Sequence, residues 1–82
     1  MRIVIADDAV LLRAGLEQLL SSLGHRVTAA TDAEELRAIA GREAFDLIIS
    51  DVRMPPTMTD DGLRAVHDLR ALNPTQPVVV LS

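Results

Sequence analysis

Short apolar runs alternate with longer segments of helical periodicity along the whole chain. The apolar runs cover residues 2–7, 25–30, 45–50 and 78–81, which is the usual length of strands. Between the first two runs, leucines recur at the spacing of one helix face: Leu12, Leu16, Leu19, Leu20 and Leu23. The order is therefore strand and helix in alternation, closed by a fourth strand. This order predicts an α/β fold in which helices cover a parallel sheet with right-handed crossovers.

Punctuating residues set the limits of these elements. Thr31-Asp32-Ala33-Glu34 matches a capping box, which predicts Thr31 as the N-cap of a second helix. A third helix is expected over residues 62–72, because Asn73-Pro74 cannot continue it. The loop over residues 51–61 contains Pro55-Pro56, which excludes a helix there. The run at 25–30 is the weakest of the four and is expected at an edge of the sheet.

Length and composition narrow the class of protein. With 82 residues, of which 49% are apolar, the chain is expected to form a single small domain over residues 1–82. Phe45 is the only aromatic residue, so the core must be aliphatic, and the leucine face of the first helix is expected to belong to it. A net charge of −4 argues against nucleic-acid binding. No apolar stretch reaches the ~20 residues of a membrane span. The lack of cysteine fits a cytoplasmic, soluble protein.

Aspartates stand at the ends of two predicted strands. Asp7 and Asp8 follow the first strand, and Asp51 follows the third. If these strands are parallel neighbours, ~4.8 Å apart, the three carboxylates converge at the carboxyl edge of the sheet. Like charges at that separation raise the pKa of a carboxylate or require a cation. Ser82 follows the fourth strand and reaches the same edge, where ligands bind in sheets of this kind.

Taken together, these residues resemble a response-regulator receiver domain, with the flavodoxin-like, CheY-like three-layer fold. The resemblance covers the whole chain, and its first and third strand ends are similar to receivers of the NarL/LuxR type. It is carried by the following segments: Ile5-Ala6-Asp7-Asp8, Arg13-Ala14-Gly15-Leu16, Asp51-Val52-Arg53-Met54-Pro55-Pro56, Asp61-Gly62-Leu63 and Ser82.

The resemblance implies a role for each site residue. Asp51 would be the phosphoacceptor, and Ser82 would supply the hydroxyl that contacts the phosphoryl group. Asp8 and Asp51 would bind Mg²⁺ directly, Asp7 mostly through water, and Arg53 through its backbone carbonyl. This donor set suits Mg²⁺, a hard ion that takes about six oxygen ligands and keeps several waters. Charge neutralisation by such an ion favours phosphoryl transfer to a carboxylate.

The chain also departs from the receiver pattern. It contains no lysine, whereas receivers carry one at the end of a fifth strand, and the loop over residues 56–60 is longer than the usual form. The sequence ends before a fifth strand and the last two helices. We therefore expect an incomplete sheet, truncated after the fourth strand. Residues 78–81 would then form an open, apolar edge, and self-association through that strand or the uncovered sheet face is expected.

Three functions are compatible with most of these features. The first is a phosphoacceptor module, not an enzyme, that relays a signal from a sensor histidine kinase to a DNA-binding output outside these residues. The second is a non-phosphorylated, self-associating interaction domain on the same scaffold. The third, a haloacid-dehalogenase-like phosphatase, ranks low because it requires an aspartate where Arg53 stands. His25 and His67 are expected on the surface, and Arg13 is expected to pair with Glu17.

Overall fold

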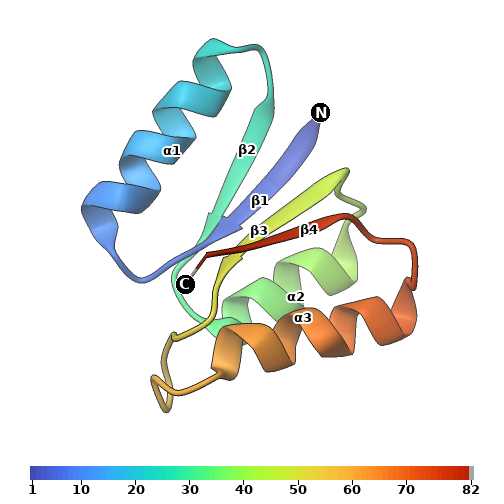
Figure 1. Ribbon diagram of the computed structural model, residues 1–82. Coiled ribbons are helices and arrows are strands. Elements are labelled where there is room, and N and C mark those ends of the chain that lie inside the picture. The colour runs from blue at the N-terminus through green and yellow to red at the C-terminus, as the bar shows by residue number, and fades with distance from the viewer. Residues whose placement is uncertain (82) are drawn as a thin grey trace.

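The computed structural model describes residues 1–81 and contains all seven predicted elements (Figure 1). The strands are β1 (Arg2–Ala6), β2 (Arg26–Ala30), β3 (Leu47–Asp51) and β4 (Val78–Leu81). The helices are α1 (Val10–Ser22), α2 (Ala33–Arg42) and α3 (Asp61–Leu72). The predicted alternation of strands and helices is confirmed. The limits differ slightly, because Asp51 is the last residue of β3 and α3 begins one residue before Gly62.

The four strands form one parallel sheet in the order β2-β1-β3-β4. The prediction that residues 25–30 form an edge strand is confirmed. The chain moves from β1 outward to β2 and then returns across β1 to β3. The strand order therefore reverses beside β1, and the crevice at the carboxyl ends of β1 and β3 is where such sheets bind ligands.

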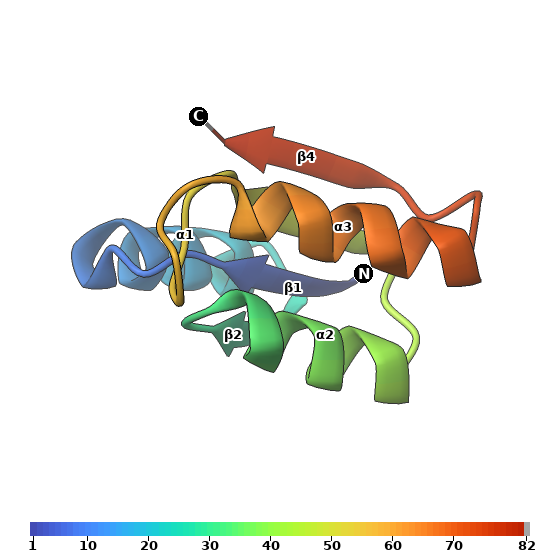
Figure 2. The same ribbon diagram turned by 90° about the horizontal axis from the view of Figure 1, so that it is seen from below.

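The face of the sheet covered by α2 and α3 carries the main core (Figure 2). Alternate strand residues such as Val4, Ala6 and Ile48 point to this face, since successive side chains of a strand point to opposite faces. They pack against small and aliphatic side chains of the two helices, and the single aromatic residue closes one end. The remaining buried members of this cluster are Ala30, Ala33, Leu36, Ile39, Phe45, Met54, Ala65, Val66 and Leu69.

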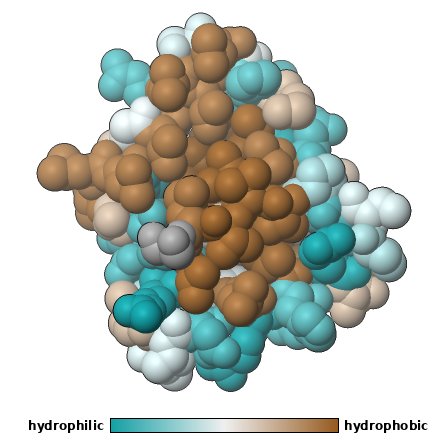
Figure 3. All heavy atoms as spheres, viewed as in Figure 1, coloured by the Kyte–Doolittle hydropathy of each residue, from teal (hydrophilic) through white to brown (hydrophobic). Residues whose placement is uncertain are grey.

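The opposite face carries α1 and is far less covered. Leu16 and Leu20 pack against Ile3, Ile5 and Ile49, but no residue of α1, all of which are described, is buried. The prediction that the whole leucine face of this helix belongs to the core was wrong: Leu12, Leu19 and Leu23 are 50–65% exposed. The helix lies beside β1 and β2, so only a narrow stripe of it reaches the sheet. The result is a broad apolar surface over the sheet and α1 (Figure 3).

The start of α2 is capped one residue later than predicted. Asp32, not Thr31, is the N-cap, and its carboxylate accepts a hydrogen bond from the Glu35 backbone N–H at 2.7 Å. The Glu35 carboxylate in turn accepts from the Thr31 N–H at 3.0 Å. This pairing resembles a capping box shifted by one residue, but the Glu35 carboxylate accepts from the residue before the N-cap and not from the N-cap itself.

Candidate functional site

Asp7, Asp8 and Asp51 meet at the carboxyl edge of the sheet, as predicted. Each offers one carboxylate oxygen, and these three oxygens lie within 4.8 Å of one another. The register explains this, because Ala6 of β1 is paired with Ser50 of β3. The residue after each of these is an aspartate, so Asp7 and Asp51 lie next to each other at the carboxyl ends of neighbouring strands. Both strands are buried up to this point, which fixes the backbone beneath the acids.

Asp7 is the most constrained of the three acids. It is only 1% exposed, and its backbone N–H donates to the Ala30 carbonyl at 3.1 Å. Its carboxylate accepts from the Ala9 N–H at 2.8 Å, which turns the chain toward α1. The N-cap of α1 is Ala9, which makes no side-chain cap bond, so neither Asp7 nor Asp8 caps the helix directly. Asp8 and Asp51 are half-buried and open to solvent.

Arg13 contributes to the site in a way that the sequence did not reveal. Its guanidinium donates to the backbone carbonyl of Asp7 at 2.7 Å, and its side chain is 16% exposed. The expected partner, Glu17, is also present, at 3.8 Å from Nε. Arg13 therefore ties the first turn of α1 to the end of β1. The only signal in the sequence was an arginine in the first turn of a predicted helix that follows an acid pair.

The three carboxylates are not neutralised by the protein. Within residues 1–81, no arginine or histidine side chain lies in ion-pair range of Asp7, Asp8 or Asp51. Three hard oxygen donors with uncompensated charge, two of them open to solvent, form a donor set that suits Mg²⁺, which retains water ligands. The residues present therefore fit Mg²⁺ as a ligand.

The backbone after Asp51 is held from two sides. The Val52 N–H donates to the Leu81 carbonyl at 3.0 Å, and the Val52 carbonyl accepts from the Gly62 N–H at 2.9 Å. Gly62 packs so closely that a β-carbon there would lie 1.8 Å from the Asp51 carbonyl oxygen. Only glycine fits this contact. Arg53 follows with an exposed side chain, and the role of its carbonyl as a metal ligand stays a prediction.

Asp61, the first residue of α3, is buried although it lies outside the acid cluster. The Thr57 hydroxyl donates a hydrogen bond to its carboxylate, and the Thr57 N–H donates another at 3.3 Å. The hydroxyl bond is the main reason that the pKa of Asp61 lies below its usual value, and it outweighs the opposing effect of burial. This pair could not be predicted from the sequence, because the path of the loop that joins its members was unknown.

The other candidate residues lie elsewhere. Ser82 is outside the described residues. His25 Nδ1 accepts a hydrogen bond from the N-terminal ammonium at 3.0 Å. His67 lies exposed on α3 beside Asp68, so neither histidine joins the acid cluster. Met54 is fully buried in the main core, whereas Met58 is exposed.

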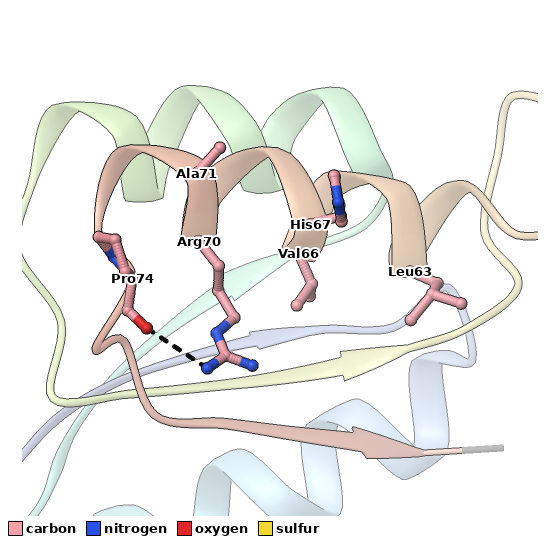
Figure 4. A pocket seen from close by; sticks show the side chains of 6 residues that line it. All are labelled: Leu63, Val66, His67, Arg70, Ala71 and Pro74. Carbon is pink, nitrogen blue, oxygen red and sulfur yellow. Dashed lines mark hydrogen bonds between the residues drawn. The ribbon is translucent and has the colours of Figure 1, made fainter.

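A groove of about 600 Å³ runs along α3, away from the three acids (Figure 4). Leu63, Val66 and Arg70 point from the helix toward β4, and the Arg70 guanidinium donates to the Pro74 carbonyl at 3.3 Å. His67, Ala71 and Pro74 complete its lining. The groove is mostly apolar, and none of the residues that line it is an aspartate or glutamate.

Comparison with known proteins identifies the family. The model of the response regulator receiver domain matches residues 3–82. The chain belongs to the response regulator receiver domain family. It is 35% identical over 79 residues to the sensor histidine kinase RcsC of Salmonella typhimurium, covering 96% of this chain and 8% of that kinase. Across the curated relatives it matches, the chain spans 8–11% of their length.

Solved structures agree with this assignment. The receiver domain of the hybrid histidine kinase CckA is 34% identical, with a TM-score of 0.85 over 98% of this chain and 73% of that one. The receiver domain of the Francisella response regulator 1452 is 27% identical, with a TM-score of 0.87 over 99% of this chain and 64% of that one. The predicted receiver fold is thus confirmed. Among residues 1–81, no helix has the length and apolar content needed to cross a bilayer.

Proposed function

We propose that this receiver domain is a phosphoacceptor module in which Asp51 takes a phosphoryl group with the help of Mg²⁺. The observation that carries the proposal is the convergence of Asp7, Asp8 and Asp51 within 4.8 Å with no cationic partner among the described residues. Receiver domains bind Mg²⁺ at such an acidic cluster. The ion would be held by Asp8, Asp51 and the Arg53 carbonyl, with Asp7 acting through water.

Each residue has a defined part in the proposed transfer. A carboxylate oxygen of Asp51 forms the new bond to phosphorus, while the donor's imidazole nitrogen leaves. Mg²⁺ supplies positive charge that offsets the charge on the transferring oxygens. Asp7, whose carboxylate accepts from the Ala9 N–H and whose backbone N–H donates to the Ala30 carbonyl, would offer a carboxylate in a fixed position to the bound ion. Ser82 keeps the phosphoryl-contacting role that the resemblance implies. The module would carry a signal and would not turn over a substrate.

The partners follow from the relatives. RcsC and CckA are named as histidine kinases, which supports a sensor histidine kinase as the phosphoryl donor. The NarL/LuxR-like motifs favour a DNA-binding transcriptional output and a cytoplasmic location. This chain itself, with a net charge of −4, is not expected to contact nucleic acid or membrane.

The phosphoacceptor proposal is tested by incubating the protein with Mg²⁺ and a small phosphodonor and measuring intact mass. Wild type should gain one phosphoryl group, and the gain should vanish in Asp51→Asn and when Mg²⁺ is chelated. Asp60→Asn is a matched control, because it removes an exposed carboxylate outside the cluster and should label like wild type. Equal labelling of Asp51→Asn and wild type would refute the assignment.

A second candidate, a self-associating interaction domain, is favoured by the apolar surface in Figure 3. Val79 and Val80 of β4 are 46% and 42% exposed on opposite faces of the sheet. Among residues 1–81, β4 has a strand partner on one side only, so its other edge presents open N–H and C=O groups. Association of the 82-residue chain through β4 or the apolar face would be compatible with phosphorylation. If no adduct formed at Asp51, self-association would be the only remaining candidate function of the two.

A further inference from the structure

We infer that Thr57 and Asp61 form a clamp that positions the backbone of Asp51 to Arg53 for metal binding. The inference rests on the proposed phosphoacceptor function. Thr57 lies in the loop of residues 52–60 that joins β3 to α3, and Asp61 is the first residue of α3. Figure 1 shows this loop between the two elements. Thr57 and Asp61 are positioning residues, because their contacts are with the loop and not with the acid cluster.

The start of α3 is in direct contact with the end of β3. Gly62 lies against the Asp51 carbonyl and bonds the Val52 carbonyl at 2.9 Å. A β-carbon at Gly62 would also lie 3.0 Å from Met54 Cε, so the fit is tight on both sides. The position of the first turn of α3 is therefore transmitted directly to the acceptor's backbone.

The first turn of α3 is in turn held in place by its first residue. Asp61 precedes Gly62 and is 5% exposed. Its carboxylate accepts both the hydroxyl and the backbone N–H of Thr57, which lies four residues back in the loop. The loop is further closed by the Met58 N–H, which donates to the Met54 carbonyl at 3.0 Å. Asp61 thus fixes both the loop and the residue that touches Asp51.

A simpler role for Asp61 is excluded. The N-cap of α3 is Asp60, and Asp61 does not join the three acids at the sheet edge. Arg64 lies 3.8 Å from Asp61 but is more than half exposed, and it also contacts Asp60 at 3.1 Å. A surface ion pair of this kind does not require a buried carboxylate. The part-buried bonds to Thr57 are the distinguishing feature. They close the far part of the loop that begins after Asp51 and includes Arg53, the proposed carbonyl ligand.

The test compares four variants of the full chain: Thr57→Val, Thr57→Ser, Asp61→Asn and the control Asp60→Asn. Thr57→Val removes the hydroxyl with little change in shape, and Thr57→Ser restores it. Asp60→Asn makes the same charge change as Asp61→Asn one residue away. Mg²⁺ affinity is measured by calorimetry, and amide hydrogen exchange is followed over residues 52–60.

Thr57→Val and Asp61→Asn should each weaken Mg²⁺ binding roughly tenfold, as loss of groups that orient metal ligands commonly does. The same two variants should speed exchange in the loop, while Thr57→Ser and Asp60→Asn should resemble wild type. Wild-type affinity and unchanged loop exchange in Thr57→Val and Asp61→Asn would overturn the clamp. Failure of wild type to bind Mg²⁺ would instead contradict the proposed function, and loop exchange in the same variants would still decide whether the clamp exists.

Discussion

At the scale of single residues, the three carboxylates of the acid cluster repel one another when no cation is bound. Asp7, Asp8 and Asp51 are close together and lack a cationic partner among the described residues. Each removed charge should therefore stabilise the metal-free protein. Two unit charges about 4 Å apart interact by about 1 kcal/mol in water, which sets the scale of the effect.

Asp51→Asn should accordingly raise the free energy of unfolding by about 0.5–1 kcal/mol in the presence of chelator. With Mg²⁺ present, wild type should instead be more stable than Asp51→Asn, because a ligand stabilises only a protein that binds it. The stabilisation is about 2.7 kcal/mol when the Mg²⁺ concentration is a hundred times the dissociation constant. Denaturant melts with and without Mg²⁺ measure both effects. Equal stabilisation of wild type and Asp51→Asn by Mg²⁺ would place the ion elsewhere.

Asp61 gives a second residue-scale prediction, on acid stability. The Thr57 hydroxyl lowers the pKa of Asp61 in the folded protein, so the folded state binds the proton less readily than the unfolded chain. The stabilisation is then fully present above the unfolded pKa of about 3.9 and is lost as the pH falls through the lower folded pKa. The gap in melting temperature between wild type and Asp61→Asn should be constant near neutral pH and shrink below about pH 4. A gap that persists unchanged in strong acid would contradict the assigned bond.

At the scale of elements, the junction between β3 and α3 is the most tightly fitted part of the site. Gly62→Ala would place a β-carbon 1.8 Å from the Asp51 carbonyl oxygen, so the helix must shift. We expect a loss of about 1–3 kcal/mol in stability, the usual cost of overpacking, together with loss of labelling at Asp51. Gly41→Ala is the matched control, because nothing lies within 4 Å of its position in α2 and the change should be neutral or stabilising. Equal melting curves for the two variants would refute the tight fit.

The elements also show what the sequence could and could not predict. The acids at the ends of β1 and β3 were predictable, because strand length and parallel pairing place them without knowledge of the loops. The path of residues 52–60 was not, so Thr57, Asp61 and the contact of Gly62 with Asp51 were missed. The leucine periodicity of α1 predicted a helix correctly but not its burial. Periodicity identifies an apolar face, and only the arrangement of neighbouring elements decides whether that face is covered.

At the scale of the whole molecule, the apolar surface on the α1 side makes a prediction about assembly. Light scattering of the 82-residue chain at micromolar concentration should show a mass that rises with concentration. Val79→Lys should shift the chain toward monomer, because it places a charge on the half-exposed face of β4. Leu72→Lys, an exposed position on α3, should leave association unchanged. A wild-type monomer that melts cooperatively would rule out the self-association reading.

The proposed function of the whole molecule depends most on one property: Asp51 accepts a phosphoryl group beside a bound Mg²⁺. Beryllofluoride mimics a phosphoryl group on a carboxylate, so fluorine NMR of the protein with Mg²⁺ and beryllofluoride reports this directly. We expect a bound fluorine signal for wild type that requires Mg²⁺ and is absent in Asp51→Asn. A signal of equal size in Asp51→Asn, or none in wild type with Mg²⁺ present, would contradict it.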